Sequence, residues 1–569
     1  MGIRGLGVVA LTALMVASGC TKGREVGRPS TRPTPTHTTM PQGDPKHLSQ
    51  DARRVVSAAC KMPAAWVERV WRGWDPGPAR GYDLSVVPHP PNWMGSVTDT
   101  SHSGPYPFLQ QIPLVFYGPR YVVTGDVKVR REVTIADVAP TTAELLDFDF
   151  PPRDSRPITE VLKPNAPRPK LIVTALIDGG GWNVLDRWTG RWPEIASLMK
   201  RGANVKGVIA GSSPSITPAI HTNMSTGAFP RRHGITAIKI RTDNGHLTDA
   251  FVPYTTYTKL DRTDPTANTD ITTLGDLYDL ETNNDALVGM VSPGLLQFGM
   301  MSMGAGIDGA DQDVAAILND EEQFSTNPRF YSLPDYVSDV PGPESELDAV
   351  DRSDGRLDGL WHDHSMPPVD ATPAFAPWEN RIMQALIDRE GFGDDDTPDL
   401  FYVNYKAPDK TGHAYNMISD EEGEVVSSVD GAVGDMIRWL DRNVGRRNYV
   451  FILTADHGQT PLDGGGWPIR PTELTEDLNA RFDSVSDDRG LVQDTSATTL
   501  FIDRKEVHAN GIEPEELAMW LMRYTIGANV DEGDAFPPDY GGREDEVIYD
   551  AVIPGRLVDD VYEECGPRH

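Results

Sequence analysis

Carboxylate and imidazole side chains recur in short pairs along this sequence. Asp178 ends the apolar run KLIVTALID, Asp409 and His413 share the segment PDKTGH, and Asp456 and His457 share LTADHG. Carboxylate oxygen and imidazole nitrogen together suit Zn²⁺, although Mn²⁺ or iron accepts similar ligands. Two such ions a few ångströms apart would stabilise the attacking and leaving oxygens of a phosphoryl displacement. The pattern therefore predicts a two-zinc centre that hydrolyses phosphate esters.

A loop rich in hydroxyl side chains, GSSPSITPAIHTNMSTGAFPRRHGI, lies between the first two of these segments. A Ser or Thr hydroxyl bound to one ion would lose its proton near neutral pH and become a nucleophile. His233, in RRHGI, is interpreted as structural. Each piece is weak alone, because an aspartate at the end of a strand often caps the next helix. The ordered set carries the prediction.

The elements that must position these residues are short apolar strands. KLIVTALID, DLFYVNYKAPD and NYVFILTADHG are almost continuously apolar before their last residues, which is typical of parallel strands buried on both faces. Ligands of open α/β sheets bind beyond the carboxyl ends of the strands, where the acidic residues fall. We therefore predict an α/β fold, with a mostly parallel central sheet, helices on both faces and a small α+β subdomain.

Three further segments complete this outline. VVSSVDGAVGDMIRWLDRNV has the spacing of a helix that packs against the sheet. TSATTLFIDRKEVHANGIEPEELAMWLMRYT predicts the strand, turn and helix of the small subdomain. Residues 320–375 are acidic, contain proline and show little periodicity, and they are interpreted as an insertion or a lid.

The charge of the chain limits its partners. The 569 residues carry a formal net charge of −32, with a pI near 4.7. Such a surface repels polyanions, so we expect no nucleic-acid duplex as a partner. A small phosphate-ester substrate stays compatible with it, because a local metal centre reverses the field in one pocket.

The N-terminus predicts an export signal. MGIRGLGVVALTALMVASGC begins with a charge and continues in an apolar run that is too short to span a membrane. Small residues directly before Cys20 resemble the bacterial lipoprotein cleavage motif, which predicts lipidation of Cys20; the alternative is an ordinary signal peptide with a chance cysteine. Residues 21–52 are rich in Pro, Thr and Gly and predict a disordered tether. We therefore expect a secreted lipoprotein anchored to the outer face of the cell membrane.

Four motifs occur in the order found in the alkaline phosphatase superfamily. The sequence resembles its nucleotide pyrophosphatase/phosphodiesterase branch over residues 170–460, where the nucleophile lies four residues before a histidine, as Thr217 precedes His221. The Cys- or Ser-x-Pro-x-Arg motif of a sulfatase is absent from SSPSITPAI. The resemblance implies a phospho-threonine intermediate at Thr217. It also implies zinc ligands: Asp178, Thr217, Asp456 and His457 for one ion, and Asp409 and His413 for the other.

One ligand of the second ion is missing from its usual place. The family has a last histidine downstream of Asp-His-Gly, but the histidines after His457 are His508 and His569, in unsuitable surroundings. At the front of the chain, SHSGPYPFLQQIPLVFYGP followed by VTIADVAPTTAELL resembles the missing C-terminal module and contains His102. The resemblance therefore implies a circular permutation in which His102 binds the ion of Asp409. His89, His362 and His364 are the alternatives.

The permutation implies a single domain over residues 53–569. Residues 53–165 would be the transposed module, 170–465 the metal-binding core, and 466–569 the small subdomain and return segment. Cys60 and Cys565, at opposite ends of this domain, invite a disulfide outside the cytoplasm, which would reconnect the chain where it was cut. The alternative is two separate buried thiols.

The substrate class depends on residues that would neutralise a phosphate monoester. The phosphatase branch carries an Asn after His-Gly-Ile and a later Lys-x-Arg pair, whereas this chain has Ile238 and the uncharged VSPGLLQFGMMSMGAG. We therefore favour phosphodiesters or nucleotide pyrophosphates. An alkaline phosphomonoesterase, with Lys239 and Arg241 as substitutes, and a non-catalytic binding lipoprotein are the alternatives. The Met-, Leu- and Phe-rich loop would contact the leaving group or simply fill the core.

Overall fold

The computed structural model describes residues 48–77, 80–96, 100–241, 245–251, 269–485, 489–531 and 534–568. The predicted signal sequence, Cys20 and nearly all of the predicted tether lie outside this range. Within it, no helix is both long and apolar enough to cross a membrane. The helix α1 (Gln50–Ala59) begins before residue 52, so the predicted end of the tether is wrong; the Ser49 side chain caps this helix by accepting from the amide of Ala52 at 3.0 Å.

The centre of the large sheet consists of three parallel strands. β6 (Leu171–Ile177) lies between β17 (Asp399–Tyr405) and β18 (Tyr449–Ala455), and every residue of the three is buried. The sheet continues from β17 through two more parallel strands, β11 (Val288–Ser292) and β12 (Asp313–Leu318). The α/β class and the mostly parallel sheet predicted from the apolar runs are confirmed.

The other half of the sheet begins with a strand from the front of the chain. β3 (Leu114–Tyr117) pairs antiparallel with β18, with Leu114 opposite Thr454, and leads to β7 (Ala203–Val205) and β4 (Gly125–Val127). The run IPLVFYG therefore shares the sheet with the two strands predicted to be its companions. Because β3 is antiparallel to β18, β3 begins at the edge where β6, β17 and β18 end. The segment that precedes β3 is thereby delivered to that edge.

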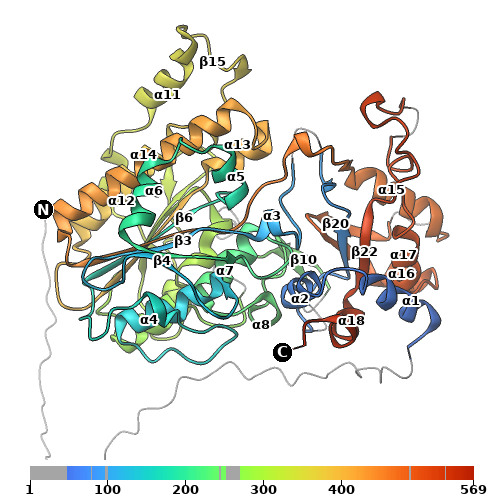
Figure 1. Cartoon of the computed structure of the whole chain (residues 1–569), viewed down its shortest axis with the longest axis horizontal. Helices are drawn as coiled ribbons and strands as arrows, with labels where there is room; N and C mark the ends of the chain where they lie inside the picture. Colours follow the sequence, from blue (N-terminus) through green and yellow to red (C-terminus); the bar gives the residue numbers. More distant parts are fainter. Residues whose placement is uncertain are drawn as a thin grey trace, which may run out of the picture. The chain divides into compact units, whose positions relative to one another are not determined.

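Helices cover both faces of this sheet, as Figure 1 shows. Along β6, Ile172 and Leu176 pack into one core and Val173 and Ala175 into another, because successive side chains of a strand point to opposite faces. The first core includes residues of α4 (Val138–Leu146) and α7 (Thr217–Thr226). The second includes residues of α6 (Pro193–Arg201), α12 (Phe375–Glu390) and the predicted helix α14 (Asp420–Leu440).

A smaller antiparallel sheet joins the two ends of the described chain. Its strands lie in the order β20 (Val492–Ser496), β21 (Thr499–Ile502), β1 (Leu84–Pro88) and β22 (Tyr549–Pro554). β1 pairs with β21 on one side and β22 on the other. The segment predicted as one transposed module is thus divided, because β1 belongs to the small sheet and β3 to the large one. In Figure 1 the blue α1 and α2 (Ala64–Gly73) lie beside the red α18 (Val558–Cys565).

A disulfide links these same ends. Cys60, which follows α1, is bonded to Cys565, the last residue of α18, with the Cα atoms 5.4 Å apart. The structure thus joins the two cysteines that the sequence analysis paired. Both also contact the apolar core of the small sheet.

Residues 320–375 connect β12 to α12, and they begin with two short strands, β13 (Phe324–Ser325) and β14 (Tyr331–Ser332), that pair with β12 in the large sheet. The α11 (Glu344–Asp351) and β15 (Leu360–Trp361) of this segment stand away from the sheet in Figure 1. The hairpin that follows is held to α14, because Trp361 Nε1 donates to Glu424 at 2.9 Å and His364 Nδ1 lies 2.6 Å from Glu421. The segment interpreted from its composition as an insertion or a lid is therefore folded and contacts both the large sheet and α14.

Candidate metal centre

Three carboxylates meet where the central strands end. Asp178 directly follows β6 and Asp456 directly follows β18, while Asp409 lies in the first turn of α13 (Ala407–Tyr415), which follows β17. All three side chains are buried. The amides of Gly179 and His457 donate to Asp456 Oδ1 at 3.0 and 2.9 Å, which fixes this carboxylate and leaves Oδ2 turned to the other residues of the site. The convergence predicted from parallel strand ends is what the structure shows.

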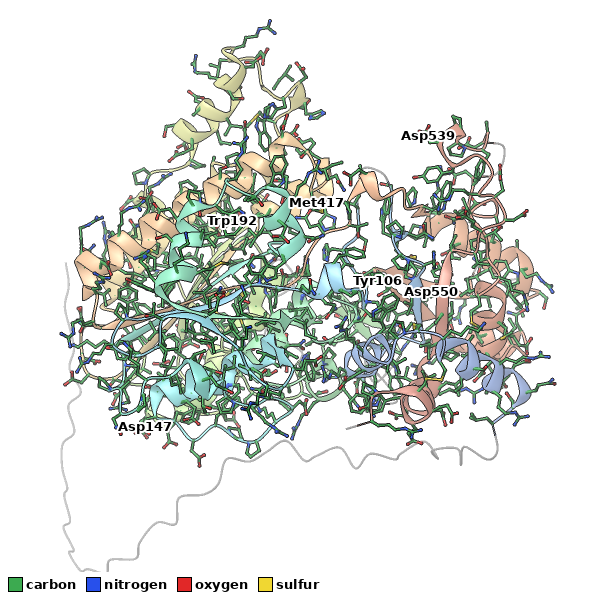
Figure 2. All side chains as sticks on the ribbon, viewed as in Figure 1. Tyr106, Asp147, Trp192, Met417, Asp539 and Asp550 are labelled. Atoms are coloured by element: carbon green, nitrogen blue, oxygen red, sulfur yellow. A yellow bond between two sulfur atoms is a disulfide. The ribbon has the colours of Figure 1, made fainter. Side chains whose placement is uncertain are left out.

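His102 reaches this cluster from the segment before β3. Its Nε2 lies 3.1 Å from Asp409 Oδ1, so the structure brings together the two residues that the sequence analysis expected to share an ion. Its Nδ1 lies 3.1 Å from the carbonyl oxygen of Ser215, so Nδ1 carries the proton and the Nε2 lone pair is free. Tyr106, labelled in Figure 2, follows on the same segment and donates its hydroxyl proton to the carbonyl of Pro88 in β1. The segment is thereby held between the two sheets.

His413 lies one helical turn after Asp409, on the same face of α13. Its Nε2 is 3.5 Å from Asp409 Oδ1, and its ring centroid is 5.0 Å from that of His102. The side chain is 32% exposed, the most open of the candidate ligands. It therefore marks the side on which the site meets solvent.

His457 occupies the middle of the centre. Its Nε2 lies 3.1 Å from Asp456 Oδ2, 3.6 Å from Asp178 Oδ1 and 3.9 Å from Asp409 Oδ1. Its ring stacks on that of His102, with centroids 3.6 Å apart, and its Nδ1 lies 3.0 Å from the Gly458 carbonyl. The ligand atoms of His102, Asp409 and His457 form one compact group. The resemblance placed His457 with Asp178, so its assignment to either ion stays a prediction.

The second compact group contains a histidine that the predicted ligand set lacks. It consists of Asp178, Asp456 and His221, and His221 Nε2 lies 3.2 Å from Asp456 Oδ2 and 3.8 Å from Asp178 Oδ2. His221 and Thr217 are one turn apart on α7, and their spacing of four was the signal for this placement. Thr217, the first residue of α7, has its Oγ1 3.4 Å from Asp178 Oδ1.

Several buried atoms of the site require a cation as a partner. Asp409 Oδ1, Asp456 Oδ2 and His457 Nε2 are buried and have no hydrogen-bond partner among the described residues. Buried ionised carboxylates are unfavourable unless a positive charge compensates them. The donor set of carboxylate oxygens and imidazole nitrogens suits Zn²⁺. The residues therefore fit a pair of divalent cations.

Lys406 is a second residue of the site, after His221, that sequence reasoning missed. Its Nζ lies 3.0 Å from Asp178 Oδ1, 3.1 Å from Thr217 Oγ1 and 2.5 Å from Asp409 Oδ2. Lys406 precedes α13, one turn before Asp409, in KAPDKTGH, and this spacing in the motif was the available signal. Burial disfavours its charge, but Asp178 and Asp409 outweigh burial and raise the pKa of Lys406. A fixed positive charge therefore contacts the hydroxyl of Thr217.

Burial and the neighbouring protein groups shift the pKa values of the two central imidazoles, His102 and His457, in opposite directions. Burial, followed by the nearby His457, lowers the pKa of His102 to about 4, so His102 is neutral at pH 7. Burial opposes the charge of His457 as well, but Asp456 outweighs it and raises the pKa of His457 to about 9. Burial and then the repulsion of Asp456 raise the pKa of Asp178 to about 6. The carboxylates alone thus attract positive charge to the middle of the site.

The alternative histidines lie elsewhere. His89 is mostly exposed and pairs with Asp550 of β22 at 2.7 Å, and His508 is exposed on α16 (Arg504–Ala509). His362 and His364 pair with glutamates of α14, and His569 lies outside the described residues. His233 is buried against the side-chain amide of Asn223 at 2.8 Å, and burial lowers its pKa to about 3, which agrees with its structural interpretation.

The residues considered for substrate discrimination are committed to other contacts. Lys239 Nζ pairs with Asp494 at 2.7 Å, and Arg241 pairs with Asp83 at 2.6 Å. The Met-rich loop forms η4 (Leu295–Met300), and Phe298 with three methionines around it is buried in the core beside α7. Of the two interpretations of this loop, the structure favours core packing.

Together with the candidate metal-binding groups, the family and the relatives that the chain matches support a hydrolase of phosphate esters. A model of the type I phosphodiesterase / nucleotide pyrophosphatase family matches residues 172–520, and the chain belongs to this family. Alkaline phosphatase PafA of Elizabethkingia meningoseptica is 22% identical over 417 residues, which cover 63% of this chain and 74% of that protein. Alkaline phosphatase PhoV of Synechococcus elongatus is 22% identical over 342 residues, covering 52% and 60%.

A human relative and two solved structures were also found. Human ectonucleotide pyrophosphatase/phosphodiesterase family member 7 is 38% identical over 65 residues, 11% of this chain and 14% of that one. The crystal structure of wild-type PafA has 20% identity and a TM-score of 0.49, over 63% of this chain and 76% of that chain. Murine ectonucleotide pyrophosphatase/phosphodiesterase 5 has 17% identity and a TM-score of 0.28, over 50% and 57%.

Proposed function

We propose that this protein is a two-zinc hydrolase of phosphodiesters or nucleotide pyrophosphates, with Thr217 as the nucleophile. The observation that carries the proposal is the position of Thr217 Oγ1, 3.4 Å from Asp178 and 3.1 Å from Lys406, beside two clusters of metal-ligating side chains. The ions would be held by the two compact groups, with Thr217 and His413 as further ligands. When bound, zinc supplies Lewis acidity and positive charge at the reacting phosphate.

The chain's own groups prepare the nucleophile. Thr217 is the first residue of α7, so its oxygen lies at the positive end of a helix. Its Oγ1 forms a bond to phosphorus as the bond to the leaving alcohol or phosphate breaks. Water then breaks the bond between Thr217 and phosphorus, releasing the second product and regenerating the hydroxyl.

Lys406 supports this step as a positioning residue. Its ammonium donates to Thr217 Oγ1 while it is held by Asp178 and Asp409, so the hydroxyl oxygen has a fixed orientation. A neighbouring positive charge also favours the alkoxide form of the nucleophile. Deleting this charge should therefore lower the rate of the chemical step more than the affinity for substrate.

A diester is favoured because the two residues that the sequence offered for neutralising a monoester are committed to other contacts. Lys239 and Arg241, the candidates for neutralising a monoester, are both paired with aspartates. A diester carries one negative charge on the phosphate and needs less compensation. The matches to alkaline phosphatases PafA and PhoV support the second candidate, an alkaline phosphomonoesterase.

We further propose that the enzyme acts outside the cell, tethered through lipidated Cys20. The apolar N-terminus ending in small residues and Cys20 supports export, and the disulfide between Cys60 and Cys565 suits an oxidising compartment. Mass spectrometry of membrane-extracted protein tests this directly. An N-terminus at lipid-modified Cys20 is expected, and an unmodified N-terminus beyond residue 20 would contradict it.

The function is tested with two synthetic esters. The zinc-loaded enzyme should hydrolyse bis-p-nitrophenyl phosphate with a higher kcat/KM than p-nitrophenyl phosphate. The reverse order would establish the phosphomonoesterase instead. Failure of the zinc-loaded protein to hydrolyse either ester would favour a binding lipoprotein that has kept the fold.

A further inference from the structure

A third group of acidic side chains lies away from the centre described above. It consists of Asp279 on α10 (Leu274–Glu281), Asp311 in the loop directly before β12, and Asp313, the first residue of β12. One carboxylate oxygen from each lies within 4.8 Å of the others. Since β12 is parallel to β11, and β11 to β17, Asp313 lies at the edge where these strands begin. The metal centre lies at the opposite edge.

This cluster lacks a compensating cation. Among the described residues, none of the three aspartates forms an ion pair with Lys or Arg, whereas Asp276 on the same helix adds a fourth negative charge. Burial, followed by the repulsion of Asp311 and Asp276, raises the pKa of Asp279 to about 7. Three carboxylates this close are unfavourable unless a proton or a metal ion joins them.

Unsatisfied oxygens point to a metal ion rather than to a proton alone. Asp279 is 1% exposed and contributes one carboxylate oxygen to the cluster, and its Oδ1 has no hydrogen-bond partner among the described residues. Asn284 Oδ1, a second buried oxygen, likewise accepts no hydrogen bond within the described chain. The Asn284 amide nitrogen donates to the Gly309 carbonyl at 3.0 Å, which ties Asn284 to the loop that carries Asp311.

We propose that Asp279, Asp311 and Asp313 bind a Ca²⁺ ion that stabilises the fold. Every ligand of the group is a carboxylate oxygen, the donor that Ca²⁺ prefers, and no imidazole or thiolate of the group would favour zinc. Oxygens on opposite sides of Ca²⁺ lie about 4.6–5.2 Å apart at the usual bond lengths of about 2.3–2.6 Å. The three carboxylate oxygens, all within 4.8 Å of one another, are therefore close enough to share one Ca²⁺ ion.

The ion would join elements that support the nucleophile's helix. Asp313 accepts from the Ser302 hydroxyl, and Asp276 Oδ1 accepts from the Met303 amide at 2.6 Å, so α10 and β12 already hold the segment after η4. η4 in turn packs on α7, where the Ser225 hydroxyl donates to the carbonyl of Gly299. Ca²⁺ would thus stabilise α10, β12 and η4, which support α7, and it would not contact the substrate.

The test measures the thermal stability of the zinc-loaded full chain as Ca²⁺ is added. At about a hundredfold excess over its Kd, Ca²⁺ should raise Tm by about 2–3 °C. Asp279→Asn and Asp311→Asn should each abolish this shift. If the substitution at buried Asp279 prevents folding, the variant at exposed Asp311 still tests the proposal. Asp308→Asn, an exposed change of equal charge in the same loop, should leave the shift intact.

Elemental analysis completes the test. Protein equilibrated with Ca²⁺ and then desalted should retain one equivalent of calcium beyond its zinc, and the Asp311→Asn variant should retain none. The proposal is overturned if no saturable shift occurs, if Asp308→Asn removes the shift as fully as Asp311→Asn, or if Mg²⁺ produces the shift and Ca²⁺ does not. None of these outcomes depends on hydrolysis of any ester.

Discussion

The two edges of the large sheet carry carboxylate clusters of different chemistry. At the edge where β6, β17 and β18 end, aspartates are mixed with histidines and Lys406 and lie beside a threonine hydroxyl. At the edge where β12 begins, three aspartates stand without any nitrogen ligand. The first set suits zinc and lies beside the hydroxyl of Thr217, whereas the second suits a hard cation. Under the two proposals, the first edge carries the chemistry and the second binds an ion that stabilises the fold.

The largest expected effect comes from removing the Thr217 hydroxyl, which should affect the metal centre and leave the Asp279 site unchanged. Thr217→Ala removes the oxygen that we propose attacks phosphorus, so hydrolysis of bis-p-nitrophenyl phosphate should fall by at least about a thousandfold. Zinc content and the Ca²⁺-dependent rise in Tm should both persist. Thr222→Ala, which deletes another buried hydroxyl of α7, is the matched control and should retain activity. Near-normal activity of Thr217→Ala would exclude it as the nucleophile, and Ser215 would be tested next.

His102 tests whether the front of the chain completes the centre. His102→Ala removes an imidazole that lies 3.1 Å from Asp409, so the protein should lose one zinc equivalent and about a hundredfold or more in activity. His89→Ala, at an exposed histidine paired with Asp550, should change neither. Two zinc equivalents retained by His102→Ala would contradict its assignment as a ligand.

Lys406 tests whether a protein charge assists the ions. Lys406→Met keeps much of the side-chain length but removes the ammonium, and kcat should fall about 10- to 100-fold with a smaller change in KM. Lys406→Arg should restore part of kcat, because the positive charge returns. Stopped-flow rates with zinc content measured in parallel check this. Loss of zinc in Lys406→Met would show instead that the lysine only maintains the site's architecture.

The disulfide should affect stability alone. Replacing Cys60 and Cys565 together by serine should lower the free energy of unfolding by ~2–5 kcal/mol and leave kcat/KM unchanged, because the bond lies in the small sheet's region. Urea unfolding of the two proteins measures the difference. Two free thiols in the secreted wild-type protein, or a cysteine-linked dimer, would show that this pairing does not form in solution.

The sequence predicted those elements whose run of apolar residues follows directly from their burial in the fold. The strands around Asp178, Asp409 and Asp456 were predictable because burial on both faces demands unbroken apolar runs. The approach of His102 to Asp409 depended on a family resemblance, since no local pattern links segments so far apart. That a circular permutation produced this arrangement stays a prediction.

The features that were not predicted from the sequence were missed for physical reasons. Lys406 and His221 each lie one turn from a motif residue. The spacing of apolar residues in the sequence does not show which faces of α13 and α7 are turned to the site. The division of the transposed module was hidden, because β1 is a five-residue run that fits either sheet. The Asp279 cluster joins a helix, a loop and a strand whose relative placement only the tertiary structure shows.

The central claim is most directly tested by crystallography with anomalous diffraction at the zinc edge. The account predicts two zinc peaks at the ends of β6, β17 and β18, one of them about 2.0–2.1 Å from His102 Nε2, and the other in contact with Asp178 and Thr217 Oγ1. A single zinc, or two zinc ions of which neither binds His102, would contradict it.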